Sequence, residues 1–317
     1  MKAIFVKLYI NNSYYSRKND NEMVKKYQVA EHVFVVAIKE ENFMGQDGLM
    51  KAYRPFETEE GEPLFSLTVD TVEEVQVPAL FVEEARQEED GQVIRSGHLS
   101  EDTKVIVYQW GEEKAVLRSS SQYENAVLTT TSHRLQHAID NSLMLLFAFA
   151  AAPASTLLFH SSTVVWHDRA YMFLGVSGTG KSTHSRLWLK NIEQTHLLND
   201  DNPVVRINEQ GIPIVYGSPW SGKTPCYRNE QYPLGAIVKL YQYPENQIQQ
   251  LSVIDSYVAL TESISGKRWE KRIAHGLNTT IGKLLEATNV FLLKCLPDAE
   301  AAQLCWQRVT VQEGGRV

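Results

Sequence analysis

The chain has 317 residues, of which 43% are hydrophobic and 22% are charged, as in a soluble globular protein of one large or two ordinary domains. Its formal net charge is −7, so there is no overall basic footprint for nucleic acid, and no such partner is expected. The three cysteines, Cys226, Cys295 and Cys305, are odd in number, widely spaced and without a C-x-x-C pair. This pattern argues against a disulfide framework or a zinc site and favours a reducing compartment.

The hydrophobic stretches predict a cytoplasmic protein with no membrane partner. The first residues lack the apolar core and small-residue cleavage site of a secretory signal. The longest apolar stretch, residues 143–159, is interrupted by Pro153, Ser155 and Thr156. Its uninterrupted part is too short to span a bilayer.

Residues 1–130 are predicted to form a β-rich N-terminal domain. Asp90-Gly91 and Gly111-Glu-Glu each lie between two β-rich runs and predict hairpins. We interpret this part as a meander of antiparallel strands that serves as a scaffold, an oligomerisation surface or a substrate-docking surface. The expected strands are residues 3–10, 33–38, 64–69, 80–86, 93–95, 104–110 and 114–118.

Residues 131–317 are predicted to form an α/β domain. A helix is expected to begin at Ser132 as its N-cap and to become buried toward Ala150, because apolar residues recur at helical spacing. Asp298 is expected to cap a last helix that runs to Arg308. The other expected elements are strands at 156–159, 163–166, 170–174, 237–241 and 290–295, a hairpin of 204–207 with 212–216, and helices at 253–263 and 268–285.

The most informative motif is Gly-Val-Ser-Gly-Thr-Gly-Lys-Ser at residues 175–182, which has the spacing of a Walker A loop. It follows a predicted buried strand and precedes a predicted helix, so its backbone N–H groups and the helix N-terminus would face bound phosphates. Lys181 would reach the β- and γ-phosphates, and the Ser182 hydroxyl would bind Mg²⁺. The alternative is a glycine-rich turn without a ligand. The predicted nucleotide-binding residues are Gly175, Ser177, Gly178, Thr179, Gly180, Lys181, Ser182 and Thr183.

Two further features suggest catalytic groups. An apolar run ends at Asp200 and Asp201, and in P-loop enzymes a carboxylate at such a strand end holds Mg²⁺. The second carboxylate could accept a proton from an attacking hydroxyl. The alternative is an Asx-turn, since Asn-Asp-Asp-Asn-Pro is a strong turn sequence. His160, at the end of another apolar run, is either a group beside the phosphates or a structural hydrogen-bonding residue.

The stretch from Phe159 to Ser182 resembles the catalytic core of the HPr kinase/phosphorylase family, in which a histidine and a β-hairpin precede a Gly-x-Ser-Gly-x-Gly-Lys-Ser loop. The Asp-Asp motif of that family matches Asp200-Asp201. The loop is also similar to that of phosphoenolpyruvate carboxykinases. The resemblance implies an α/β P-loop kinase core in which His160 and the aspartates assist proton transfer, while Lys181 and Ser182 contact phosphate and metal. Its useful motifs extend from residue 132 to about residue 240.

Some positions depart from that family. Thr183 and His184 stand where HPr kinases have a glutamate after the loop. A segment from Gly217 to Lys223 looks like the Gly-x-Pro-Trp/Phe segment of the broader HPr-kinase-like group. Lys223 is either a phosphate contact or a solvated turn residue, and Trp220 either stacks on a substrate or packs in the fold. The N-terminal part does not resemble the regulatory domain of true HPr kinases.

These observations predict a Mg²⁺-dependent kinase that transfers a phosphoryl group from ATP, ADP or pyrophosphate to a hydroxyl. The expected acceptor is a serine of a small protein or peptide, or a free amino acid. Two alternatives remain at this point: a nucleotide-binding regulatory or assembly module without turnover, and an enzyme of the phosphoenolpyruvate carboxykinase type. The sequence leaves open whether the chain forms homo-oligomers.

Overall fold

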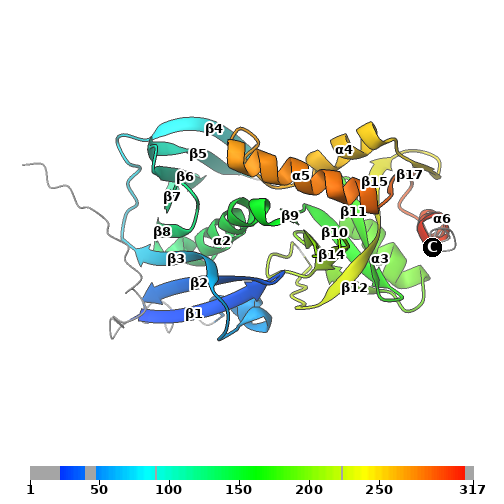
Figure 1. Ribbon diagram of the computed structural model, residues 1–317, viewed down its shortest axis with the longest axis horizontal. Helices are drawn as coiled ribbons and strands as arrows, with labels where there is room; N and C mark the ends of the chain where they lie inside the picture. The colour runs from blue at the N-terminus through cyan, green and yellow to red at the C-terminus, as the bar shows by residue number, and fades with distance from the viewer. Residues whose placement is uncertain (1–21, 40–47, 90, 223, 311–317) are drawn as a thin grey trace, which may run out of the picture.

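The computed structural model describes residues 22–39, 48–89, 91–222 and 224–310. Two mixed β-sheets lie one beside the other along the long axis of the molecule, with helices between and around them (Figure 1). The expected α/β fold class is therefore confirmed. The strand expected at residues 3–10 lies outside the described residues.

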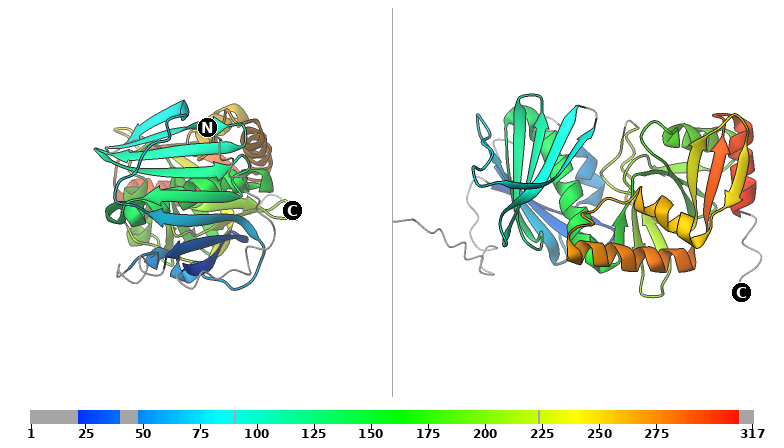
Figure 2. Two further views of the ribbon diagram at one scale, coloured as in Figure 1. Left: turned by 90° about the vertical axis from the view of Figure 1, so that its left-hand side faces the viewer. Right: turned by 90° about the horizontal axis from the view of Figure 1, so that it is seen from above.

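The first sheet has eight strands in the order β1-β2-β3-β8-β7-β6-β5-β4, and one face of it fills the left-hand view of Figure 2. The prediction of a purely antiparallel meander is wrong, because β3 is parallel to both β2 and β8. A parallel pair needs a long crossover, which the connection from β2 to β3 supplies with the 3-10 helix η2 (Lys51–Phe56). The strands are β1 (Glu22–Val29), β2 (His32–Lys39), β3 (Pro63–Thr71), β4 (Val82–Glu89), β5 (Gln92–Ser100), β6 (Thr103–Trp110), β7 (Glu113–Ser120) and β8 (Asn125–Thr130).

Both hairpins predicted in this sheet are confirmed. Glu89 pairs with Gln92 across the first turn, and Trp110 pairs with Glu113 across the second. Gly111 has φ 64, a left-handed conformation that glycine adopts without steric cost. The local turn signals thus predicted these pairings correctly.

The helix α2 (Leu135–Ala151) runs between the two sheets and packs against β3, β8 and β9. It begins at Leu135 rather than after a Ser132 cap, because Ser132 lies in a preceding 3-10 turn, η3 (Ser132–Arg134). Together with η4 (Ala152–Ala154), this helical stretch is long and apolar enough to cross a membrane. However, 67% of its most apolar window is buried inside the protein, so we interpret it as a core helix.

The second sheet has nine strands, seven of them in the order β12-β10-β11-β15-β14-β13-β9. β15 also pairs in parallel with β17, and β16 lies antiparallel to β17. The strands are β9 (Thr156–Leu158), β10 (Ser161–Trp166), β11 (Arg169–Leu174), β12 (His196–Asn199), β13 (Val204–Ile207), β14 (Pro213–Tyr216), β15 (Gln231–Gln242), β16 (Gln247–Gln250) and β17 (Val290–Cys295). The hairpin of β13 with β14 matches the predicted one.

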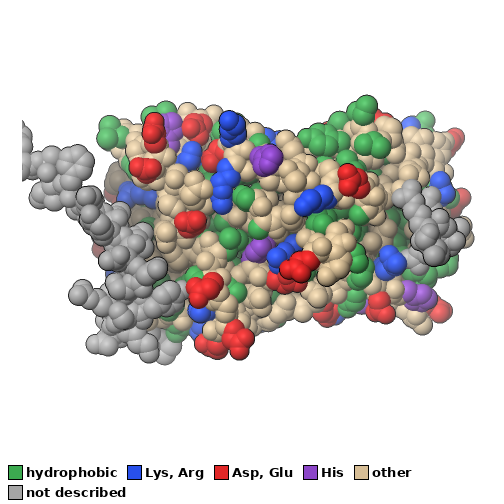
Figure 3. All heavy atoms as spheres, viewed as in Figure 1, with side chains coloured by type: hydrophobic (Ala, Val, Ile, Leu, Met, Phe, Trp, Pro, Cys, Tyr) green, Lys and Arg blue, Asp and Glu red, His purple; other side chains and the backbone are tan. Residues whose placement is uncertain are grey.

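Four more helices pack around the second sheet. They are α3 (Lys181–Asn191), α4 (Val253–Thr261), α5 (Lys271–Ala287) and α6 (Ala299–Thr310). The backbone N–H of Ala301 donates to Asp298 Oδ1 at 2.9 Å, so the predicted cap of α6 is confirmed. Apolar side chains gather on the surface over α4 (Figure 3), where Val253 and Ile254 are 72% and 77% exposed.

The largest hydrophobic core is continuous through both sheets. It contains Phe34 and Phe65 of the first sheet, Phe147 of α2, and Leu157 and Val205 of the second. A second core lies where α3 and α6 cover the second sheet, around Trp188. The N-terminal strands therefore pack on the part of the chain that carries the predicted chemistry.

Candidate functional site

The glycine-rich loop joins the end of β11 to the start of α3, as the sequence predicts. Gly178 has φ 78 and Gly180, at the N-cap of α3, has φ 106. Side chains disfavour these left-handed conformations, so the two positions favour glycine. Thr179 closes the loop: its backbone N–H and its hydroxyl donate to Val176 O at 3.1 and 2.7 Å. The loop thus ends at a helix N-terminus, a geometry that suits an anion.

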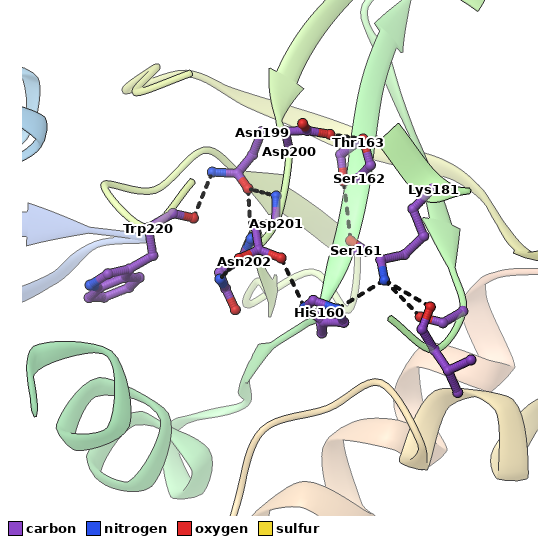
Figure 4. A network of polar contacts seen from close by, with 12 residues as sticks. His160, Ser161, Ser162, Thr163, Lys181, Asn199, Asp200, Asp201, Asn202 and Trp220 are labelled. Atoms are coloured by element: carbon purple, nitrogen blue, oxygen red, sulfur yellow. Dashed lines mark hydrogen bonds and ion pairs between the residues drawn. The ribbon is translucent and has the colours of Figure 1, made fainter. Parts of the chain in front are cut away.

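Lys181 is the first residue of α3, and only 9% of it is exposed. Its ammonium group donates to the carbonyl oxygen of Gly175 at 2.8 Å and to that of Val176 at 3.4 Å. It also donates to His160 Nε2 at 2.9 Å (Figure 4). The lysine is therefore held inside the curve of the loop, beside the histidine.

His160 lies between β9 and β10, and its backbone N–H donates to Ser263 O at 2.7 Å. Its Nδ1 is 3.0 Å from Asp201 Oδ1. Because the Lys181 ammonium can only donate, Nε2 is the acceptor, so in the neutral ring Nδ1 carries the proton and donates to Asp201. Lys181, His160 and Asp201 thus form a continuous chain of hydrogen bonds beside the loop (Figure 4).

The turn after β12 orients Asp201. Asn199 Oδ1 accepts the backbone N–H groups of Asp201 and Asn202 at 2.9 and 2.8 Å, an Asx-type turn. The side-chain amide of Asn202 donates to Asp201 Oδ2 at 2.9 Å. The backbone N–H of Ser161 donates to Asp201 O at 2.8 Å and ties the turn to β10. The turn and the catalytic interpretations of this motif are therefore compatible, since the turn directs Asp201 toward His160.

Asp200 is held differently from its neighbour. It is 5% exposed, whereas the Asp201 side chain is 30% exposed. Asp200 Oδ1 accepts the Ser162 hydroxyl at 2.7 Å, and Ser162 Oγ lies 2.6 Å from Ser185 Oγ on α3. Adjacent carboxylates thus face two environments, one toward His160 and one toward the inner side of α3.

The remaining predicted site residues belong to the loop and its surroundings. Ser177 and Thr183 are exposed and Ser182 is half-buried at the start of α3. Lys223 lies outside the described residues. Among the described residues, no group of three or more histidine, cysteine, aspartate or glutamate side chains gathers to hold a metal ion.

The residues that support the Asp200–Asp201 turn from behind were not predicted from the sequence. The side-chain amide of Asn199 donates to Ser218 Oγ at 3.2 Å and to Trp220 O at 3.4 Å. Gly222 lies so close that a Cβ there would be 3.2 Å from Asp201 Cβ. The asparagine that precedes the two aspartates was the available signal, because asparagine favours such turns.

Trp220 packs inside the fold, the second of the two interpretations of this residue. It is 5% exposed, and its indole N–H donates to the Tyr53 hydroxyl at 3.0 Å. Its ring lies 5.2 Å from that of Phe147 on α2. Trp220 therefore anchors the segment behind the site to the N-terminal part of the chain.

No family model and no curated protein matches this sequence. Solved structures do match, among them the HPr(Ser) kinase/phosphatase from Coxiella burnetii, at 12% identity and a TM-score of 0.30. The match covers 50% of this chain and 99% of that one. At this TM-score the likeness establishes neither a shared fold nor a shared activity, so the interpretation of the site depends on its own residues.

Proposed function

We propose that this protein is a phosphotransferase that uses a nucleotide or another polyphosphate to phosphorylate a hydroxyl group, with Mg²⁺ as cofactor. The observation that carries the proposal is the chain from Lys181 through His160 to Asp201, with 2.9 and 3.0 Å contacts, beside the glycine-rich loop. Phosphoryl transfer needs a cradle for the donor and a group that accepts the proton of the attacking hydroxyl. The loop and this chain of residues supply both.

On the donor side, the loop N–H groups and Lys181 would bind the phosphates. The ammonium group now contacts two backbone carbonyls and His160. A phosphate in the loop would replace these neutral acceptors with a negatively charged one, which adds direct attraction between opposite charges. Binding of the donor would therefore draw Lys181 away from His160.

On the acceptor side, Asp201 would take the proton of the hydroxyl. It is the more exposed of the two aspartates, and His160 donates to one of its oxygens. Once Lys181 contacts phosphate, His160 Nε2 has a free lone pair and could accept a proton in turn. Asp201 and His160 would thus act as one proton-accepting pair.

We propose Ser182 and Asp200 as the main metal ligands and Asp201, whose main role is to accept a proton, as an additional one. All are oxygen donors, which suits Mg²⁺, an ion usually bound by one or two carboxylates together with substrate phosphates and water. When bound, Mg²⁺ would neutralise charge on the phosphates. Ser162 would keep the Asp200 carboxylate oriented through its 2.7 Å hydrogen bond.

The proposed acceptor is a serine hydroxyl on a small protein, a peptide or a free amino acid, and the proposed location is the cytoplasm. The resemblance in motifs supports this acceptor class, and the side chains of His160 and Asp201 are 42% and 30% exposed, so an acceptor can reach them from solvent. The paired proton acceptors favour this reaction over a regulatory module without turnover, because a binding protein does not need a base.

The test is Mg²⁺-dependent phosphoryl transfer with ATP, ADP and pyrophosphate as donors, against serine, serine peptides and size-fractionated cell extract. We expect Asp201→Asn to lower turnover by about 10²- to 10⁴-fold, the usual contribution of a general base, while nucleotide binding is kept. Lys181→Ala should weaken nucleotide binding itself. The matched control is Asp102→Asn, at an exposed carboxylate between β5 and β6.

Two results would overturn the proposal. Tight nucleotide binding with no transfer to any acceptor would favour the regulatory module. Transfer that is unaffected by both Asp200→Asn and Asp201→Asn would show that the reaction does not use this pair of carboxylates.

A further inference from the structure

Three parallel strands of the second sheet end at the edge that carries the glycine-rich loop. β15 pairs in parallel with both β11 and β17, so the carboxyl ends of the three strands lie side by side (Figure 1). The loop follows β11 at this edge, and in open α/β sheets ligands bind outside the carboxyl ends of the strands. The end of β15 is therefore in a position to contact a ligand that the loop holds.

Tyr241, near the end of β15, lies beside the loop. β11 ends opposite Lys239 of β15, so Tyr241 is two residues beyond the level at which the loop begins. Neighbouring strands are only about 4.8 Å apart. The next residue, Gln242, donates its side-chain amide to the carbonyl oxygens of Gly178 and Thr179 at 3.2 and 3.4 Å. This end of β15 is thus held directly against the loop.

The ring of Tyr241 is open to solvent. Its side chain is on the same face of β15 as that of Lys239, which pairs with Glu262 at the end of α4. Tyr241 is 56% exposed, and no aromatic ring or cation of the described residues packs on it. Tyr243 differs, since the Lys294 ammonium group lies 5.2 Å from its ring centroid. Tyr241 therefore presents a free aromatic surface next to the loop.

The order of the strands gives a direction to a donor bound in the loop. β10, β11 and β15 follow one another in the sheet. His160 directly precedes β10, and the turn that holds Asp201 is tied to β10, so both lie on one side of β11 and Tyr241 lies on the other. A donor that turns its terminal phosphate toward His160 and Asp201 therefore extends its other end toward β15. In a nucleoside triphosphate, that end is the ribose and the base.

We propose that the phosphoryl donor is a nucleoside phosphate whose base stacks on Tyr241. The inference rests on the proposed phosphotransferase function, because it names the ligand of that site, and it favours a nucleotide over pyrophosphate, which has no base. Stacking on an aromatic side chain tolerates every base, since each base has a π-face. The assignment is therefore to nucleotides as a class and not to adenine.

The test measures binding of ATP and of tripolyphosphate to the full chain by isothermal titration calorimetry, with Mg²⁺ present. Tripolyphosphate has the phosphate chain of ATP without the nucleoside. Tyr241→Leu should weaken ATP binding by about 5- to 100-fold, the range for loss of one stacked base, and leave tripolyphosphate binding unchanged. Tyr241→Phe keeps the aromatic ring and should bind ATP as the unmodified protein does.

The matched control is Trp269→Leu, at an aromatic residue before α5 that is 54% exposed, and it should bind both ligands as the unmodified protein does. Unchanged ATP binding in Tyr241→Leu, or equal losses for ATP and tripolyphosphate, would overturn the assignment of Tyr241 and leave the phosphotransferase proposal in place. Binding of neither ligand to the unmodified protein would overturn both proposals.

Discussion

Acid should loosen the helix that begins with Lys181, through a histidine one turn further along. His184 lies on the inner side of α3 and is 3% exposed. Its Nε2 accepts the Trp188 indole N–H at 3.2 Å, and its ring meets that of Phe173 at 4.7 Å. Burial lowers the pKa of His184 from 6.5 to about 4. The folded protein therefore holds this ring in its neutral form.

The sign and the size of the effect follow from this pKa. Below pH 6.5 the unfolded chain takes up a proton that the folded chain refuses, so the stability present above pH 6.5 is lost as the pH falls toward 4. Each pH unit between the two pKa values lowers the free energy of unfolding by about 1.4 kcal/mol. The loss is about 2 kcal/mol at pH 5 and roughly 3 kcal/mol at pH 4. In addition, protonation would place a second N–H against the Trp188 donor.

The assay is urea unfolding, followed by tryptophan fluorescence, at about pH 7.5 and about pH 5. His184→Gln keeps an acceptor for Trp188 but cannot become charged. We expect the loss of unfolding free energy between the two pH values to shrink by about 2 kcal/mol in this variant. The matched control is His275→Gln at an exposed position of α5. An unchanged pH dependence in His184→Gln would refute the reasoning.

Three further substitutions test the support of the fold and of the site. Asn199→Ala removes the side chain that shapes the turn at Asp200–Asp201. It should lower turnover by about 10- to 100-fold and leave nucleotide affinity unchanged. A loss of affinity instead of turnover would contradict this role. Gly217→Ala would place a Cβ 2.0 Å from the carbonyl oxygen of Arg228. This clash should lower the free energy of unfolding, measured in urea, by roughly 1–3 kcal/mol. An unchanged urea midpoint would be inconsistent with that contact. The Lys267 side chain is 3% exposed and its ammonium group lies 3.1 Å from the Glu270 carboxylate. Glu270→Gln removes this counter-ion and should lower the free energy of unfolding by about 3 kcal/mol. Equal stability of the variant and the unmodified protein would disprove this.

Local sequence signals predicted the elements around the loop well. The loop, the strand before it and the helix after it each depend on residues that are close together in the sequence. β11 begins and ends close to the predicted strand at 170–174, and α3 follows the loop as predicted. The same holds for the Asp90-Gly91 hairpin and the Asp298 cap. Short-range backbone preferences are sufficient in these cases.

Contacts between distant residues could not be predicted in this way. The parallel pairing of β3 with β2 and β8 depends on which strands meet in space, and alternating apolar residues suit either orientation. The hydrogen bond from Trp220 to Tyr53 joins positions 167 apart. A sequence shows that a tryptophan is large and apolar, but it does not show whether the ring packs inside the fold or stacks on a substrate.

The helices η2 and α2, which pack beside the N-terminal sheet, support the candidate site from behind. Asp140 on α2 accepts the Tyr53 hydroxyl at 2.9 Å, and Tyr53 in turn accepts the Trp220 indole N–H. Trp220 O then accepts the amide of Asn199, the residue that orients Asp201. Loss of the Tyr53 hydroxyl would leave the buried Trp220 indole N–H without this partner, at a cost of about 1–3 kcal/mol. The position of the Asp201 carboxylate is therefore set partly by residues of the N-terminal half, where the sequence showed no catalytic motif.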